Sequence, residues 1–444
     1  MSISQKHPSS METTSIGEVE QVYRKVARRL MPFLIICYIV SYLDRANISF
    51  AKLQFMNDLG FSEAAYGLGA GLFFIGYVLF EVPSNMLMQR IGARKTLLRI
   101  MVLWGGISSA MMFVSSPTMF YVMRFFLGAA EAGFFPGVIY YLACWFPAAR
   151  RGRVTGFFMM GAAAAGIIGG PVSTWIMVHL SGVNNLHGWQ WLFLLEGMPA
   201  VVLGFVAFFY LCDKPNEAAW LSEREKSMVL GDLAAEEPQV PGSKKRGLRA
   251  ALSNPKLYVG ILGYFCVLVT FNAIGFWAPT IIKDVGAKDL VTIGWLSSLV
   301  FLAGALGTYL IGFSSDRRME RRWHLAISSA VIAVCFALLP LAAHSVALAI
   351  TLLAAAACAS YGSFVVFWTI PPSFLPGDTK AGGIALITSI GGIGAFVSPT
   401  LVGAMKAATG SIYAGLMILG AITFVGALIM LFAIPAEASG KGAK

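Results

Sequence analysis

Apolar runs long enough to cross a lipid bilayer recur along almost the whole chain. A helix that spans about 30 Å of hydrocarbon needs about 20 consecutive, predominantly apolar residues. Twelve such runs can be counted, so the sequence predicts an all-α membrane protein with twelve transmembrane helices. Their approximate bounds are 30–51, 65–89, 96–116, 118–145, 154–180, 190–212, 257–282, 291–313, 324–343, 346–371, 382–406 and 412–434.

The composition excludes a soluble globular protein. Of the 444 residues, 57% are hydrophobic and only 12% are charged, whereas about 25% of the residues in a typical soluble domain are charged. A polar segment precedes the first apolar run, and no small-residue cleavage site follows Met31-Pro32. We therefore expect the first run to be a retained helix and not a signal peptide.

The net charge of +11 is explained by orientation in a membrane, and we expect no nucleic-acid partner. With an even number of spans and the N-terminus inside, 27 of the 33 Lys and Arg lie in cytoplasmic segments. That asymmetry follows the positive-inside rule, and it predicts a multi-pass protein of the inner (plasma) membrane with both termini in the cytoplasm. The remaining six are Lys52, Lys283, Lys288 and Lys406 on the outside, with Arg45 and Arg124 inside the membrane.

The chain shows no arrangement typical of metal, cofactor or catalytic chemistry. The six cysteines sit in apolar runs or at their ends, and the five histidines lack metal-ligand spacing. The glycine clusters Gly67-x-Gly69-x-Gly71 and Gly391-Gly392-x-Gly394 follow no strand and precede no Walker lysine. Close helix packing explains these glycines better than nucleotide binding does. We therefore expect no metal, no cofactor, no catalytic residue and no use of ATP.

A long polar segment divides the apolar runs six and six. The expected organisation is an N-terminal cytoplasmic segment over 1–29, a six-helix half over 30–212, a linker over 213–254, a second six-helix half over 255–435 and a cytoplasmic tail over 436–444. Apolar residues at helical spacing predict an amphipathic helix over 16–31, which either lies on the inner leaflet or forms a solvated lead-in. The linker, with its basic run Lys244-Lys245-Arg246, is expected to be flexible.

Internal repetition supports two equivalent halves. Pro171 and Pro399 are 228 residues apart, and each follows clustered glycines. Two further pairs of segments recur at nearly the same offset, after spans two and eight and after spans four and ten. They are Gln89-Arg90-x-Gly92-x-Arg94-Lys95 with Asp316-Arg317, and Trp145-Phe146-Pro147 with Phe374-Leu375-Pro376. The pattern predicts two parallel six-helix repeats.

Four charged residues lie inside apolar runs, where each costs about 2.5–3.5 kcal/mol near the membrane centre. Asp44 and Arg45 are adjacent in the first run, and Arg124 and Glu131 lie in the fourth. Seven helical residues fall about 20° short of two turns, so Arg124 and Glu131 point the same way, about 10 Å apart. Two buried acids and two buried bases suit the holding and release of a charged solute. The alternative is that they form structural ion pairs that hold the bundle together.

The loop motif Gly312-x-x-x-Asp316-Arg317 resembles the signature of the major facilitator superfamily. Four other segments are similar to the anion:cation symporter branch of that family, and in particular to bacterial tartrate and 4-hydroxyphenylacetate permeases. The first-half loop departs from the general motif, because Asn85 and Gln89 replace its glycine and aspartate. The four segments are Tyr42-Leu43-Asp44-Arg45-Ala46-Asn47, Phe80-Glu81-Val82-Pro83-Ser84-Asn85, the run from Arg124 through Glu131 to Pro136-Gly137, and the run from Gly188-Trp189 to Glu196-Gly197.

The resemblance implies two six-helix halves in which spans 1, 4, 7 and 10 line a central cavity. It implies that Arg45 faces the solute, with Glu131 as its working partner, while Asp44 turns towards a neighbouring helix and pairs with Arg124. Asp44 and Glu131 are then the candidates for proton coupling. The candidate substrate contacts are Arg45, Tyr77, Arg124, Asn272, Trp277, Trp368 and Thr369, and the candidate inner-gate residues are Arg90, Arg94, Asp316 and Arg317.

The function favoured by these features is proton-driven import of an organic carboxylate by alternating access. The anion would be a tartrate-like hydroxy acid, a sugar acid or an aromatic acid, and the carrier would work as a monomer in the bilayer. An organic-anion exchanger or exporter of the same fold would use the same residues. A drug-efflux antiporter would be expected to carry more acids than arginines in its cavity, and a membrane enzyme would need a catalytic constellation that the sequence does not show.

Overall fold

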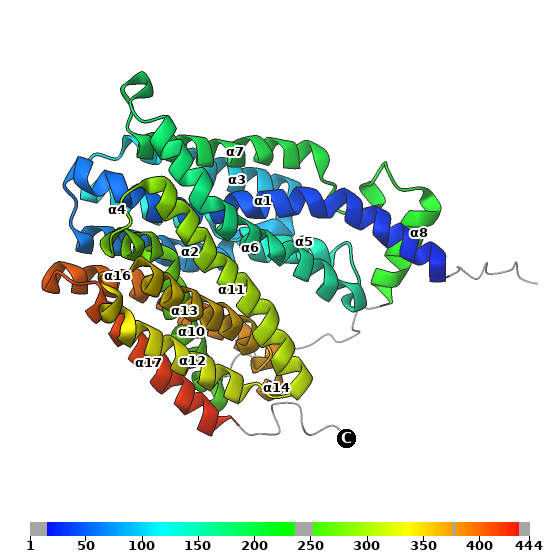
Figure 1. Cartoon of the computed structure of the whole chain (residues 1–444). Coiled ribbons are helices and arrows are strands. Elements are labelled where there is room, and N and C mark those ends of the chain that lie inside the picture. Colours follow the sequence, from blue (N-terminus) through cyan, green and yellow to red (C-terminus); the bar gives the residue numbers. More distant parts are fainter. Residues whose placement is uncertain (1–15, 236–251, 376–378, 435–444) are drawn as a thin grey trace, which may run out of the picture.

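The computed structural model describes residues 16–235, 252–375 and 379–434, and within these ranges it is a bundle of membrane-spanning helices (Figure 1). Twelve helical segments are long and apolar enough to cross a membrane, which confirms the expected number. The basic run Lys244-Lys245-Arg246, the first 15 residues and the tail over 436–444 lie outside the described residues.

The first six spans use seven helices, because the fourth span is broken. Serine side chains begin two of them: the hydroxyls of Ser62 and Ser116 accept hydrogen bonds from the backbone N–H groups of Ala65 and Met119, as N-caps do. The helices are α1 (Ile16–Leu59), α2 (Glu63–Ile91), α3 (Ala93–Ala110), α4 (Pro117–Glu131) with α5 (Phe134–Ala143), α6 (Ala148–His179) and α7 (Gly188–Tyr210). Short 3₁₀ turns follow α3 at Met111–Phe113 and α6 at Val183–Asn185.

The last six spans repeat this arrangement, with breaks in spans ten and eleven. Asn254 and Asp289 cap the first two helices through their side-chain oxygens. The helices are α10 (Pro255–Asp284), α11 (Leu290–Arg318), α12 (Arg322–Leu338) with a 3₁₀ turn (Leu339–Ala342), α13 (Val346–Phe367) with α14 (Pro371–Phe374), α15 (Thr379–Gly391) with α16 (Ile393–Thr409), and α17 (Tyr413–Ala433).

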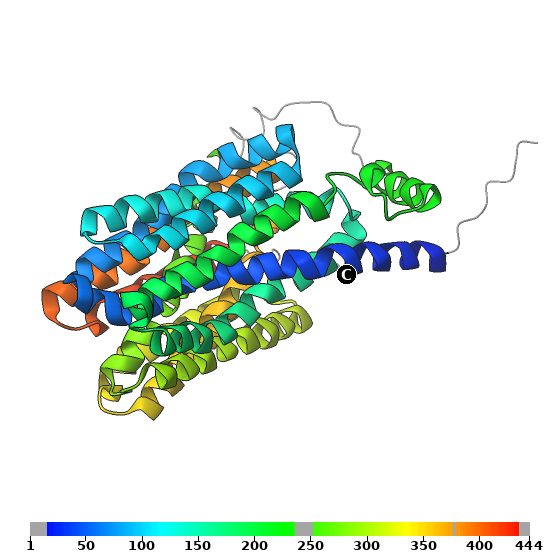
Figure 2. The same cartoon turned by 90° about the horizontal axis from the view of Figure 1, so that it is seen from above.

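The N-terminal amphipathic segment is continuous with the first span. Helix α1 has 44 residues, about 66 Å at 1.5 Å per residue, and its first turns extend beyond the rest of the bundle (Figures 1 and 2). Its apolar face is buried in protein: Val22, Tyr23 and Val26 are at most 6% exposed. The face that was expected to meet the inner leaflet or solvent is therefore covered by another part of the chain.

The cover comes from the linker, whose first half is folded. It forms a 3₁₀ turn (Pro215–Glu217) and helix α8 (Glu223–Ala234), and α8 contacts α1. The phenol of Tyr23 donates to Asp232 at 3.0 Å, and the Lys25 ammonium pairs with Glu225 at 2.8 Å. The Lys25 hydrogen bond lowers the pKa of Glu225 from its usual value. The flexible part expected of the linker falls on residues that the structure does not describe.

The two halves meet at one end of the bundle. We call the end where α1 begins and α17 ends the termini end, and the opposite end the far end. At the far end α2 packs against α16 and α6 against α11, and a Cβ atom at Gly294 would lie 2.7 Å from the carbonyl oxygen of Gly170. Glycine at these positions lets the backbones of the two halves touch. The halves splay apart towards the termini end (Figure 1).

The break in the fourth span falls directly after Glu131. Helix α4 ends there, and Gly133 has φ +91°, a conformation that glycine adopts without strain. A Cβ atom at Gly133 would also lie 2.7 Å from the Cβ atom of Ser84. Breaks of this kind are tolerated at membrane depth only where protein or a water-filled site surrounds them. The break places the Glu131 carboxylate at a helix end in the interior of the first half.

Candidate functional site

The centre of the first half contains a buried ion pair between the two residues expected to work together. The Arg45 Nε atom donates to Glu131 Oε1 at 2.7 Å, and the Ser41 hydroxyl donates to the same oxygen at 2.7 Å. The Glu131 side chain is fully buried, whereas that of Arg45 is 26% exposed. The second carboxylate oxygen, Oε2, has no hydrogen-bond partner among the described residues. The pair therefore combines a carboxylate that is shielded from solvent with an arginine that solvent can reach.

The ring of Phe73 is within cation–π distance of two arginines. The guanidinium carbon of Arg124 is 4.8 Å from the Phe73 ring centroid, and that of Arg45 is 5.6 Å from it. Arg45 also lies 5.1 Å from the ring of Tyr77 and 5.6 Å from that of Tyr42. Aromatic faces attract cations, and the attraction is larger where water is excluded. The expected substrate contact Tyr77 therefore does lie beside Arg45, and Phe73 is a central residue that the sequence analysis did not single out.

Asp44 and Arg124 are not paired with each other, which corrects the partner expected for each. Asp44 does turn towards a neighbouring helix, but its Oδ1 atom accepts hydrogen bonds from the hydroxyl of Ser108 in α3 and from Asn47 at 3.2 Å. The Nε atom of Arg124 donates weakly to the carbonyl oxygen of Gly69, at 3.4 Å. Serine and asparagine donors bind only the Oδ1 atom of Asp44, and its buried Oδ2 atom has no hydrogen-bond partner among the described residues. The fully buried Arg124 contacts a carbonyl and a ring, and it forms no ion pair with Asp44.

The second half offers aromatic rings where the first half offers charges. Phe271 contacts Tyr361 at 4.4 Å and Phe364 at 5.4 Å between ring centroids, and Tyr264 contacts Trp368 at 5.0 Å. Tyr264 lies within electrostatic range of Arg45 and Tyr77 of the first half, and Tyr361 lies within range of Tyr42. Tyr264 and Tyr361 are therefore the members of this ring cluster that lie near charged or polar residues of the first half.

Three of the four residues expected to bind substrate in the second half lie outside the far-end contacts described below. Trp368 is half-buried beside Tyr264, and Thr369 is exposed, with its hydroxyl bonded to the carbonyl of Val366 at 2.7 Å. The amide of Asn272 donates to the carbonyl of Leu268, one turn back on α10, at 2.9 Å. None of the described contacts brings Asn272 or Thr369 to Arg45.

The fourth, Trp277, belongs to a separate cluster at the far end. Its ring is fully buried and lies 3.9 Å from the Lys52 ammonium and 5.3 Å from the ring of Tyr66. Lys52 is seven residues beyond Arg45, about 10 Å further along α1. Trp277 is therefore in contact with a buried lysine and not with the Arg45 pair.

Lys52 begins a chain of charges that crosses between the halves. We call Lys52, Glu63, Lys406 and Asp284 the far-end network. The Lys52 ammonium pairs with Glu63 at 2.7 Å within the first half, and it donates to the Thr280 hydroxyl of the second half at 3.2 Å. Lys406 of the second half pairs with Glu63 at 3.1 Å and with Asp284 at 2.8 Å. Together with Trp277, these contacts join α1 and α2 to α10 and α16.

The residues expected to form the inner gate bond within their own halves. Asp316 pairs with Arg321 at 2.5 Å. Arg94 donates through Nε and Nη2 to the carbonyl of Phe208 at 2.9 and 2.6 Å, and its backbone N–H donates to Asp213 at 2.9 Å. Arg90 and Arg317 are exposed. Their role in a gate stays a prediction.

The profile of the Major Facilitator Superfamily matches this sequence over residues 34–399 and again over 287–444. The chain belongs to the major facilitator superfamily. The family and its relatives identify a membrane transporter and not an enzyme.

Relatives within the superfamily cover nearly the whole chain. A Pseudomonas putida protein named "Putative metabolite transport protein NicT" is 45% identical over 440 residues, 97% of this chain and 99% of the relative. An Acinetobacter baumannii "Quinolone resistance transporter" is 40% identical and covers 94% of this chain and 96% of its own length. An Agrobacterium vitis "Putative tartrate transporter" is also 40% identical, over 93% and 94% of the two chains.

A solved transporter structure shares the fold. The crystal structure of a D-xylose–proton symporter aligns with a TM-score of 0.74 at 18% sequence identity, and it covers 93% of this chain and 98% of that one. At this level of identity the likeness shows the shared fold alone.

Several residues of the site escaped the sequence analysis because their signals are ordinary. Phe73, Tyr264 and Phe271 are aromatic residues in apolar runs, where packing is the usual role of such residues. Lys52 was assigned to the outside by the charge count, yet it is 3% exposed. Its position inside the same helix as Asp44 and Arg45 was the available signal for a buried role.

Proposed function

We propose that this protein is a proton-coupled transporter that imports an organic carboxylate by alternating access. The observation that carries the proposal is the Arg45–Glu131 pair, in which a partly exposed arginine holds a fully buried acid. The planar fork of arginine suits a carboxylate, because it can donate two parallel hydrogen bonds. A substrate carboxylate and Glu131 would therefore compete for the same cation.

The competition supplies the coupling. When the substrate anion takes Arg45, Glu131 loses its counter-charge in a site without water. A buried carboxylate without a partner costs several kcal/mol, so it binds a proton instead. The loaded carrier would then hold one substrate charge on Arg45 and a neutral Glu131. The empty carrier would return with the Arg45–Glu131 pair re-formed.

The distribution of Lys and Arg supports a cytoplasmic position for both termini. In that orientation the far end faces the outside, and the contacts of the far-end network close that side. The exposed fraction of Arg45 would then be reached from the cytoplasm. We infer an inward-facing state of an inner-membrane carrier that works as a monomer.

The rings of the second half favour an anion with an apolar or aromatic body. Tyr264, Phe271 and Tyr361 can stack on a flat ring, whereas a sugar acid needs several hydrogen-bond partners for its hydroxyls. An aromatic carboxylate would bind Arg45 with its acid and the second half with its ring. Two relatives are named a putative tartrate transporter and a quinolone resistance transporter. For this reason the test below also includes tartrate and a fluoroquinolone.

Transport in proteoliposomes with an imposed pH gradient tests the proposal. The panel contains tartrate, a sugar acid, benzoate-type and pyridine-type acids, a fluoroquinolone, and the amide of each acid. We expect gradient-driven accumulation of an acid and no competition by its amide. Equal competition by the amide would assign the arginines a structural role. Accumulation only when the gradient is reversed would identify the exporter of the same fold.

Glu131→Gln tests the coupling step separately. Glutamine imitates the protonated acid, so exchange of labelled for unlabelled substrate should continue and lose its pH dependence. Net uptake should fall at least tenfold, because the empty carrier would leave Arg45 unpaired at several kcal/mol. Glu196→Gln is the matched control, since Glu196 is a buried acid that accepts from Ser173 at 2.8 Å and pairs with no arginine among the described residues. If the Glu131→Gln variant still accumulated substrate in response to a pH gradient, the coupling site would lie elsewhere, with Asp44 as the next candidate.

A further inference from the structure

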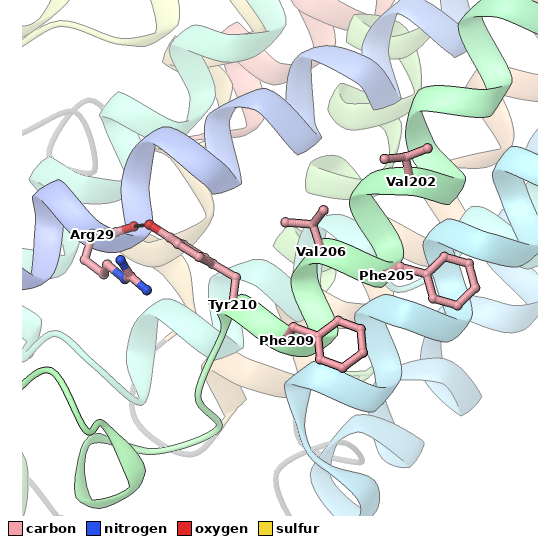
Figure 3. A pocket seen from close by; sticks show the side chains of 6 residues that line it. All are labelled: Arg29, Val202, Phe205, Val206, Phe209 and Tyr210. Carbon is pink, nitrogen blue, oxygen red and sulfur yellow. Dashed lines mark hydrogen bonds between the residues drawn. The ribbon is translucent and has the colours of Figure 1, made fainter.

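The outer surface of the first half has an apolar groove between α1 and α7, close to the termini end. Figure 3 shows the six residues that line it. Four of them form a stripe along α7 at helical spacing and are between 40% and 78% exposed. They are Val202, Phe205, Val206 and Phe209, and the other two lining residues are Tyr210 and Arg29.

Arg29 sits at one end of this stripe, against Tyr210 (Figure 3). Its guanidinium carbon lies 4.1 Å from the centroid of the Tyr210 ring, and the Tyr210 hydroxyl donates to the Arg29 carbonyl at 2.8 Å. Among the described residues no carboxylate forms an ion pair with Arg29. A guanidinium that stacks on a ring uses its face, so the N–H groups at its edge stay available to an anion.

The position and length of the groove match one leaflet of a bilayer. Tyr210 is the last residue of α7, so the arginine end of the groove lies where the span meets the polar headgroups. The segment from Val202 to Tyr210 covers nine residues, and its eight steps of 1.5 Å extend about 12 Å along the helix. Half of the hydrocarbon thickness is about 15 Å. An acyl chain that follows the stripe would therefore reach from the headgroup level almost to the membrane centre.

We propose that this groove binds one anionic phospholipid of the leaflet at the termini end. Its phosphate lies on Arg29, and one acyl chain follows α7 over Val206 and Val202. Basic residues at headgroup level attract anionic lipids by about 1 kcal/mol each, roughly a fivefold preference. The lipid would brace α1, which carries Arg45, against α7 within the same half.

Native mass spectrometry of the detergent-solubilised full chain tests the site. The probes are dioleoyl phosphatidylglycerol and dioleoyl phosphatidylcholine, which share their acyl chains and differ in headgroup charge. We expect the first bound phosphatidylglycerol to be held about fivefold more tightly than phosphatidylcholine. Arg29→Gln should abolish the preference while phosphatidylcholine binding stays unchanged, which also shows that the variant is folded. Val206→Trp, which fills the groove, should weaken the binding of both lipids.

Arg28→Gln is the matched control, because Arg28 is an exposed arginine one residue away that does not line the groove. It should keep the preference for phosphatidylglycerol. An equal loss in Arg28→Gln and Arg29→Gln would show diffuse attraction by surface charge and overturn the proposal. So would equal binding of the two lipids by the wild type. Water-soluble glycerophosphoglycerol should not compete, and full competition by it would identify a site for a free phosphate ester instead.

Discussion

Replacing Lys52 by methionine should release the far end of the carrier. Methionine is unbranched like lysine, is one atom shorter, and carries no charge. Glu63 keeps a partner in this variant, because Lys406 lies 3.1 Å from it. The change therefore removes the Lys52 contacts without leaving a buried acid unpaired.

Only contacts that break when the far end opens contribute to the shift. The ion pair of Lys52 with Glu63 lies within one half, so it is present in both states and contributes little. The contacts that cross between the halves are the hydrogen bond to Thr280 at 3.2 Å and the approach to the Trp277 ring at 3.9 Å. A hydrogen bond from a charged donor is worth about 1.5 kcal/mol or more, and a buried cation–π contact about 1–2 kcal/mol. Their sum, about 3 kcal/mol, corresponds to roughly a 150-fold change in the ratio of outward-facing to inward-facing carrier.

Spin-label distance measurements can detect a shift of that size. Labels at Asn57 and Lys288, two exposed positions at the far end of opposite halves, would report its opening in a background without the six free cysteines. We expect Lys52→Met to gain a population at longer distance. Lys283→Met is the control: its exposed ammonium also crosses to the other half, at 3.2 Å from the Leu53 carbonyl, but water replaces that bond easily. An unchanged distance distribution in Lys52→Met, or an equal change in the control, would refute the conclusion that Lys52 keeps the far end closed.

Three further predictions address the site and the N-terminal extension. Arg45→Lys keeps the charge and loses the fork, so substrate affinity should fall about 10-fold to 100-fold in a thermal-shift titration, and unchanged affinity would remove Arg45 from the site. Phe73→Leu removes the ring that faces both arginines, so it should lower the melting temperature and the uptake rate together, at about 0.5–2 kcal/mol per contact; normal values of both would contradict the role of Phe73. Docking of α8 on α1 should be complete at neutral pH and weaken as the pH falls through the lowered pKa of Glu225. Hydrogen exchange in α8 would show this weakening. The Lys25→Gln variant should lose docking at a higher pH than the wild type, and an unchanged pH of this transition would exclude the Lys25 contact as its cause.

The number of membrane spans was readable from the sequence because each span is a separate, local signal. A run of about 20 apolar residues identifies a span whatever its neighbours are, and all twelve were found. The fold of the linker was not readable in the same way. Helix α8 is stabilised by contacts to residues about 200 positions earlier, such as the Lys25–Glu225 pair, and a polar helix of 12 residues has little stability by itself.

The pairing of charges was predictable only in part for the same reason. Helical spacing put Arg124 and Glu131 on one face of their span, and the structure places both in the interior of the first half. Helical spacing could not show that Ser108 and Asn47 donate to Oδ1 of Asp44, because hydroxyl and amide donors are common and their pairing depends on how helices rotate. The far-end network is a contact between the halves, so no single segment of the sequence predicts it.

The distribution of charges and rings between the halves bears on how coupling would work. Arg45, Glu131, Asp44 and Arg124 all lie in the first half, so the competition between substrate and Glu131 for Arg45 does not depend on the position of the second half. The second half changes the surroundings of these charges. Its Tyr264 lies near Arg45, and its Tyr361 lies near Tyr42. Its residues Thr280 and Trp277 contact Lys52 at the far end. A ring-bearing anion on Arg45 would bind both halves at once, while a protonated Glu131 would lower the charge enclosed between them. In the proposed mechanism, substrate and proton would both lower the free-energy cost of closing the aromatic half over the charged half, and this shared effect would couple their movement across the membrane.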